Sequence, residues 1–173
     1  MSILKVRGTL PTDKSELVIL DRDGTLNVDS GYSFQLGELI LIEGVLETLS
    51  DERFQHSIFA IASNQAGICK GKFSTDQSIM FTEKLCQLLA ASNIHISAFI
   101  FCPHGEFMNR SNEACEYRKP NPGMLILLMK LFGIPKESTI FVGNSNADKY
   151  AALNAGIRFI PVREVFPKIG DFS

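Results

Sequence analysis

The sequence has little net charge, few cysteines and no long apolar run. Across its 173 residues, 17 Lys and Arg nearly balance 19 Asp and Glu, which gives a net charge of -2. Because this balance supplies no basic surface, we expect no nucleic-acid partner. No apolar stretch is long enough to span a bilayer, and the N-terminus lacks the basic-then-apolar order of a signal peptide. These absences predict a cytoplasmic protein that does not act at a membrane.

The four cysteines are too few and too scattered to form a disulfide scaffold, which also favours a reducing compartment. They are Cys69, Cys86, Cys102 and Cys115. No repeat, low-complexity segment or linker divides the chain. We expect residues 17–173 to form a single domain, and we assign no function to an N-terminal arm of residues 1–16, where Ile3, Leu4 and Val6 could add an edge strand. The oligomeric state stays open, and a monomer is compatible with the sequence.

Five short apolar segments alternate with helical patterns. The expected strands are residues 17–20, 57–62, 98–101, 139–142 and 158–162. The expected helices lie within residues 44–53, 74–89, 121–132 and 146–155. Alternation of this kind predicts an α/β protein, a three-layer αβα sandwich around a Rossmann-like parallel sheet of about five strands. The connections leave no room for a large cap domain.

Several helix ends carry their own signals. Ser74 and Gln77 have the form of a capping box, which predicts a helix start. Asn121 followed by Pro122 suits an N-cap with proline at the first helical position. Gly133 and Gly156 are expected to end the last two helices.

Two carboxylates follow the first buried strand. Asp21 and Asp23 lie two residues apart in an extended chain, so their side chains point the same way, and Gly24 allows an immediate turn. In open α/β sheets, ligands bind beyond the carboxyl ends of the strands. One carboxylate of such a pair can attack phosphorus while the other handles protons, and both can hold a hard cation. The simpler alternative is a polar turn after a core strand.

Polar groups at two other positions fit the same chemistry. Ser63 and Asn64 close the second strand, where they could donate hydrogen bonds to phosphoryl oxygens; the alternative is an ordinary Ser-Asn turn. The Lys119 ammonium could stabilise the charge that builds up in phosphoryl transfer, and Arg118 could hold a second anionic group. The alternative for this basic pair is a solvated surface patch.

In combination, these segments resemble one branch of the haloacid dehalogenase (HAD) superfamily. The chain is similar to the D-glycero-D-manno-heptose 1,7-bisphosphate phosphatases and their sister group, the histidinol-phosphate phosphatases, over roughly residues 17–162. The resemblance rests on Asp-Arg-Asp-Gly-Thr-Leu-Asn-Val-Asp from residue 21, Ser-Asn-Gln-Ala-Gly-Ile from 63, Gly-Lys-Phe from 71, Cys-Pro-His from 102 and Arg-Lys-Pro-Asn-Pro-Gly-Met from 118.

The resemblance implies a Mg²⁺-dependent phosphatase without a large cap, acting on a small phosphorylated metabolite such as a phosphosugar. Asp21 would be the nucleophile and Asp23 the general acid and base. Lys119 would be the third catalytic residue, and the Mg²⁺ ligands would come from Asp21, Asp23, Asn144 and Asp148. In these families the loop after the third strand also binds zinc.

The chain departs from the family pattern at two positions. The fourth motif of the family is Gly-Asp-x-x-x-Asp, but here Asn144 replaces the first Asp, which binds Mg²⁺ directly. The family's zinc loop has four Cys and His ligands, whereas this chain keeps Cys102, His104 and Cys115 and has Tyr117 at the fourth position. Three ligands with water or Glu116 could still hold zinc; the alternative is that the cysteines are now ordinary small loop residues. The three-residue set predicts less than one zinc per chain.

Two classes of function therefore remain open. The first is a phosphatase for a heptose bisphosphate, for histidinol phosphate or for another phosphosugar. The second is a catalytically weakened relative that binds a phosphorylated ligand or a protein partner, which the change at Asn144 would favour.

Overall fold

A six-stranded sheet forms the centre of the protein. The computed structural model describes residues 2–9, 13–105 and 115–166. The strands are β1 (Ile3–Val6), β2 (Glu16–Leu20), β3 (Ser57–Asn64), β4 (Ile96–Cys102), β5 (Thr139–Gly143) and β6 (Arg158–Pro161), in the spatial order β1-β4-β3-β2-β5-β6. β1 pairs antiparallel with β4, and the other pairings are parallel. The five predicted parallel strands are therefore confirmed.

The central strand β2 has an unbroken apolar sequence because both of its faces are buried. It lies between β3 and β5, and its last four residues are fully or almost fully buried. Val18 and Leu20 belong to the apolar core on one face of the sheet, while Leu17 and Ile19 belong to the core on the other. Both faces of a parallel sheet are covered by helices, so alternation with polar residues is absent.

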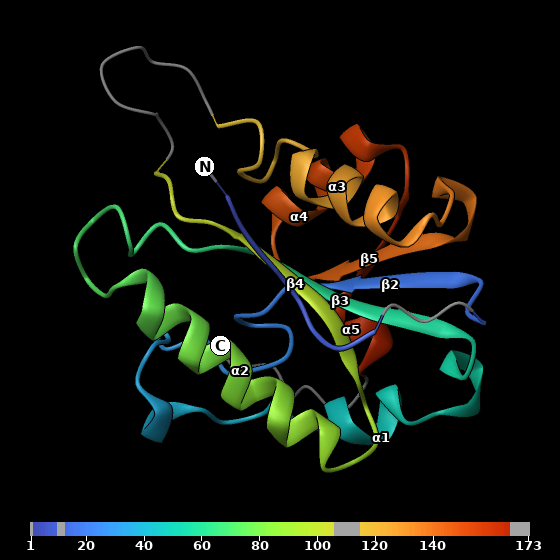
Figure 1. The fold of residues 1–173 in the computed structure, drawn as a ribbon, viewed down its shortest axis with the longest axis horizontal. Coiled ribbons are helices and arrows are strands. Elements are labelled where there is room, and N and C mark those ends of the chain that lie inside the picture. Colours follow the sequence, from blue (N-terminus) through green and yellow to red (C-terminus); the bar gives the residue numbers. More distant parts are fainter. Residues whose placement is uncertain (1, 10–12, 106–114, 167–173) are drawn as a thin grey trace.

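Helices cover both faces of the sheet and complete the three-layer αβα sandwich (Figure 1). One face is covered by α1 (Val45–Leu49), α2 (Thr75–Ala90) and α5 (Val162–Val165), and the other by α3 (Gly123–Phe132) and α4 (Asn146–Ala155). Short 3-10 helices occur at Leu36–Glu38, Glu52–Phe54 and Lys136–Ser138. No helix in the described part of the chain is long and apolar enough to cross a membrane.

Most predicted helix ends are confirmed. The capping box of Ser74 and Gln77 is formed at the start of α2, and Gly133 and Gly156 end α3 and α4 in the left-handed region. The start of α3 was predicted wrongly, because Pro122 is the N-cap and Gly123 the first helical residue. The Asn121 side chain donates instead to the Cys115 carbonyl, 3.0 Å away, so it fastens the preceding loop rather than the helix.

The N-terminal arm and one helix also differ in detail from expectation. The arm contributes the edge strand β1, which the sequence left open. The helix expected within residues 44–53 ends at Leu49, and a separate 3-10 helix, Glu52–Phe54, follows after Ser50 and Asp51. Residues 106–114 and 167–173 of the predicted single domain lie outside the described residues, as do residues 10–12 of the arm.

A flap, residues 27–41, follows the turn after β2. Its two ends pair, because Val28 donates its backbone N–H to Ile40 and Ile42 donates to Leu26. Within the flap, the rings of Tyr32 and Phe34 contact Phe73 from the loop before α2. The flap therefore lies beside the ends of β2 and β3, and the described residues contain no larger cap.

Candidate active site

The carboxylate pair lies where β2 ends. The Asp21 N–H donates to the Val142 carbonyl on the neighbouring strand β5 (2.9 Å), which fixes the end of the strand. Gly24 then turns the chain with a φ of 73°. A side chain at residue 24 would also collide with Asn144, because a Cβ there would lie 2.0 Å from its Nδ2. The left-handed φ therefore favours glycine at this turn, and any other side chain would also require Asn144 to move.

A cavity of about 250 Å³ opens at this edge of the sheet. Six of the predicted site residues line it: Asp21, Asp23, Ser63, Asn64, Lys119 and Asn144. Asp29 and Gly31 of the flap and Ser145 and Ala147 at the start of α4 complete the lining. The ends of three strands, the flap and the loop before α3 thus bring together residues that are far apart in the sequence. The predicted site residues Arg118 and Asp148 do not line this cavity.

Lys119 lies between two carboxylates. Its Nζ is 2.7 Å from Asp21 Oδ1 and 2.6 Å from Asp148 Oδ1, and it also donates to the Ala62 carbonyl at 2.9 Å. Burial disfavours the ammonium, but the negative charges of Asp21 and Asp148 outweigh this effect and raise the pKa of Lys119. The lysine is therefore a fixed positive charge beside the candidate nucleophile.

Asp21 titrates unusually high. Burial raises its pKa to about 7, and the negative charges of Asp148 and Asp23 add to the effect, while the Lys119 ammonium opposes it. A perturbed carboxyl group in a cleft with a specific charged partner is typical of a functional site.

The pKa of Asp23 is shifted in the opposite direction, because of Arg22. The guanidinium donates to Asp23 with Nη2 at 2.8 Å and Nε at 3.1 Å. Asn27 Nδ2 and Gln65 Nε2 donate to the same carboxylate at 3.0 and 2.8 Å. Burial alone would raise the pKa of Asp23, but the charge and hydrogen bonds of Arg22 lower it.

Arg22 and Gln65 are site residues that sequence reasoning missed. Arg22 is 1% exposed, and its Nη2 also donates to Gln65 Oε1 (2.9 Å) and to the Ser33 carbonyl in the flap (3.0 Å). Gln65 Nε2 in turn donates to Ser63 Oγ at 2.9 Å. The signal that could have found Arg22 is its place directly after a buried strand. An arginine side chain is almost never buried unless it is paired, so a buried Arg22 would have to pair with a nearby carboxylate.

Ser63 and Asn64 lie at the end of β3, as predicted. The Asn64 amide holds the backbone of Lys119 from both sides: Asn64 Nδ2 donates to the Lys119 carbonyl (2.9 Å), and the Lys119 N–H donates to Asn64 Oδ1 (3.0 Å). Asn64 therefore positions the lysine in addition to lining the cavity.

The two fourth-motif residues occupy different environments. Asn144 is exposed and lines the cavity. Asp148 is 0% exposed; Oδ1 pairs with Lys119, and Oδ2 accepts hydrogen bonds from the Ser145 N–H (3.0 Å) and Oγ (2.6 Å). In this arrangement Asp148 is the counterion of Lys119.

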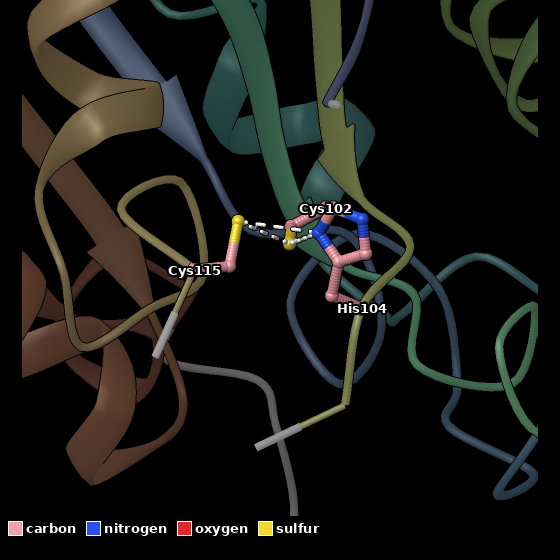
Figure 2. A group of neighbouring side chains, drawn as sticks. All are labelled: Cys102, His104 and Cys115. Atoms are coloured by element: carbon pink, nitrogen blue, oxygen red, sulfur yellow. Dashed lines mark hydrogen bonds between the residues drawn. The ribbon is translucent and has the colours of Figure 1, made fainter. Parts of the chain in front are cut away.

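The three zinc-loop residues form a separate group. Cys102 Sγ, His104 Nδ1 and Cys115 Sγ lie within 4.8 Å of one another, and Figure 2 shows them converging from both ends of the loop. Burial raises the pKa of Cys102 to about 12. Arg118 Nη1 donates to the His104 carbonyl at 2.9 Å, so this arginine contacts the zinc-loop group and does not line the cavity.

The fold and the site together define a phosphatase of the HAD type, with an aspartate pair at the end of the central strand and a lysine beside the first aspartate. A family model described as polynucleotide kinase 3 phosphatase matches residues 16–166, and the chain belongs to this family.

The chain is also similar to curated heptose bisphosphate phosphatases. The chain is 33% identical over 159 residues to the D-glycero-beta-D-manno-heptose-1,7-bisphosphate 7-phosphatase of Haemophilus influenzae, covering 91% of this chain and 86% of the relative. It is 34% identical over 146 residues to the enzyme of the same name from Pasteurella multocida, covering 82% and 77%.

Solved structures share the fold. A protein described as a HAD-like phosphatase, from Mesorhizobium loti, superposes with a TM-score of 0.81 at 25% identity, covering 90% of this chain and 76% of that one. The D,D-heptose 1,7-bisphosphate phosphatase of B. bronchiseptica, solved with magnesium and phosphate, gives a TM-score of 0.73 at 27% identity, covering 90% and 89%.

Proposed function

We propose that this chain removes one phosphate from a heptose bisphosphate-type phosphosugar through an aspartyl-phosphate intermediate. The observation that carries the proposal is the convergence of Asp21, Asp23 and Lys119 on one cavity. The names of the curated relatives support the substrate class. The proposal places the enzyme in the cytoplasm and requires neither nucleic acid nor a membrane.

In this mechanism Asp21 attacks phosphorus and Asp23 handles protons. Its low pKa favours the ionised form of Asp23, which activates the water that hydrolyses the intermediate. In the first step Asp23 must instead protonate the leaving oxygen. A phosphoryl dianion in the cavity assists this step, because a nearby negative charge raises the pKa of a carboxyl group.

Lys119 stabilises the charge on the phosphoryl oxygens, since it is already fixed beside Asp21. Ser63 and Asn64 supply hydrogen-bond donors at the same cavity. Arg118 does not line the cavity, and we assign it to an anionic group of the substrate distal to the reacting phosphate.

The residues present fit a magnesium site with a reduced charge. Asp21, the Asp23 backbone carbonyl and Asn144 offer oxygen atoms around one cavity, the donor type that Mg²⁺ prefers. A bound Mg²⁺ would neutralise phosphoryl charge and favour the ionised form of Asp21. Asp148, whose oxygens bond Lys119 and Ser145, is assigned to this site through Lys119.

Asn144→Asp tests the metal assignment. The change restores a negative charge, worth on the order of 1.5 to 3 kcal/mol, so the Mg²⁺ concentration for half-maximal turnover should fall roughly ten- to hundred-fold. The measurement is a Mg²⁺ titration of the phosphatase rate for both forms. An unchanged titration would show that Asn144 is not a metal ligand.

A panel of phosphomonoesters tests the substrate. Heptose 1,7-bisphosphate, histidinol phosphate, other sugar phosphates and a generic aryl phosphate are compared by kcat/KM at saturating Mg²⁺. The proposal predicts the highest value for the heptose bisphosphate. A preference for histidinol phosphate or another phosphosugar would move the enzyme to the sister specificity, whereas no turnover of any ester would favour the binding protein.

We also assign Cys102, His104 and Cys115 to a zinc ion. Two sulfurs and one imidazole nitrogen already lie within 4.8 Å of one another, as ligands of one small cation must. The role of such an ion here is structural, since it would join the two ends of the loop that leads into Arg118 and Lys119.

A further inference from the structure

The loops after β3 and β4 are fastened to each other beside the zinc group. The Gln65 N–H donates to the Cys102 carbonyl at 2.7 Å, and the Cys69 N–H donates to the Pro103 carbonyl at 3.3 Å. Pro103 lies between two of the zinc-group residues. The backbone of Cys69, 33 positions before Cys102 in the sequence, is therefore held next to the zinc loop.

The thiol of Cys69 also borders this loop. A Cβ at Gly105, the residue after His104, would lie 3.5 Å from Cys69 Sγ, so no side chain at position 105 separates the thiol from the loop. Cys69 is exposed, and its Sγ donates a weak hydrogen bond to Ala66 in its own turn, at 3.1 Å. Because this contact is weak, rotation about the Cα–Cβ bond can redirect the sulfur at little cost.

The residue at the family's fourth ligand position is engaged elsewhere. Tyr117 packs against the apolar core beneath α3 and α4, where its ring is partly buried. Structural zinc sites almost always have four ligands in a closed tetrahedron, and three cysteines with one histidine are a common set. Three sources of a fourth ligand therefore remain: a residue from another segment of the chain, Glu116, or water.

We propose that Cys69 is the fourth zinc ligand, so that a site of three thiolates and one imidazole joins the loops after β3 and β4. This deepens the zinc assignment made above and rests on it. On binding, the Cys69, Cys102 and Cys115 thiols release their protons to water, and neutral His104 binds through Nδ1. Such a site carries one net negative charge, and the Arg118 guanidinium, bonded to the His104 carbonyl, lies beside it as counterion.

A closed site changes the expected metal content. The three-residue set predicts less than one zinc per chain, whereas the closed set predicts a stoichiometric ion. The ion would also brace the active site, because the loop after β3 directly follows Ser63 and Asn64, and Cys115 precedes Arg118 and Lys119 by only a few residues.

The test compares the wild type with Cys69→Ser and with a matched control, Cys86→Ser, which removes a thiol that α2 buries in the core. Zinc affinity is measured by competition with a chromogenic chelator, and the sulfur count by the thiolate-to-metal absorbance of the Co²⁺ form. Cys69→Ser should weaken zinc binding by more than the roughly 10- to 100-fold typical of an outer-shell change, and should lower the absorbance by about a third. The control should keep both values.

Alkylation provides a second readout. Zinc should protect Cys69 from iodoacetamide in the wild type, as mapped by peptide mass spectrometry, because a metal-bound thiolate is shielded. The Cys69 proposal fails alone if Cys69→Ser binds zinc with unchanged affinity, its Co²⁺ form keeps the wild-type absorbance, and Cys69 of the zinc-bound wild type stays reactive. In that case Glu116 or water closes the site. If the wild type binds no zinc, the three-residue assignment fails as well. Neither outcome affects the phosphatase proposal, which the substrate panel tests separately.

Discussion

Asp21→Asn is expected to abolish turnover while leaving the protein folded. The amide cannot attack phosphorus, and losing a nucleophile should lower kcat by at least about 10³-fold. The fold should tolerate the change because Lys119 keeps its 2.6 Å pair with Asp148. The raised pKa of Asp21 also shows that its ionised form is disfavoured in the site, so a neutral group carries no penalty of this kind.

The measurement is the rate of phosphate release together with the midpoint of thermal unfolding, with exposed Asp13→Asn as the matched control. We expect the midpoint of Asp21→Asn to equal or exceed that of the wild type. Residual turnover comparable to the wild type would remove Asp21 from the mechanism.

Lys119→Met should damage both activity and stability. It removes the fixed charge beside the phosphoryl oxygens, which should lower kcat by at least about 10²-fold. It also leaves Asp21 and Asp148 as neighbouring carboxylates without their cation, and breaking a buried ion pair by deleting one partner costs about 3–5 kcal/mol. The free energy of unfolding should fall by this amount in a denaturant titration.

A double variant separates the two effects. Adding Asp148→Asn to Lys119→Met removes the buried carboxylate that lost its partner, so much of the stability should return while kcat stays low. Lys130→Met, at an exposed position on α3, is the control and should change neither quantity measurably. If Lys119→Met is as stable as the wild type, the buried lysine is not held by these two carboxylates.

The sequence was most informative where one short segment carried the whole signal. The buried strand β2 and the pair Asp21 and Asp23 could be predicted because an unbroken apolar run and a two-residue spacing are local features. The capping box of Ser74 and the helix-ending Gly133 are local in the same way. Each depends on a few consecutive residues rather than on the tertiary fold.

Contacts between distant segments were harder to predict. Lys119 is 98 residues from Asp21, and the resemblance to HAD phosphatases, rather than any spacing, connected them. The pairing of Asp148 with Lys119 and the position of Cys69 beside the zinc loop depend on how loops from different strands meet. No local pattern encodes such contacts.

The burial of Arg22 shows a further limit. Its neighbours Asp21 and Asp23 face the cavity, but the guanidinium packs over the Phe81 ring and bonds Thr82 of α2. Which helix covers that face of the sheet decides this contact, so the sequence around residue 22 could not supply it.

The most direct test of the central claim, phosphoryl transfer through Asp21, is to trap the intermediate in Asp23→Asn. An aryl phosphate with a good leaving group needs little protonation, so phosphorylation of Asp21 can proceed, but without a general base the aspartyl-phosphate should hydrolyse slowly and accumulate. The measurement is the intact mass of the variant after brief exposure to the ester with Mg²⁺, followed by peptide mapping. We expect one phosphoryl group per chain on Asp21, and none in the Asp21→Asn, Asp23→Asn double variant. A phosphoryl group on another residue, or none while the wild type hydrolyses the same ester, would contradict phosphoryl transfer through Asp21.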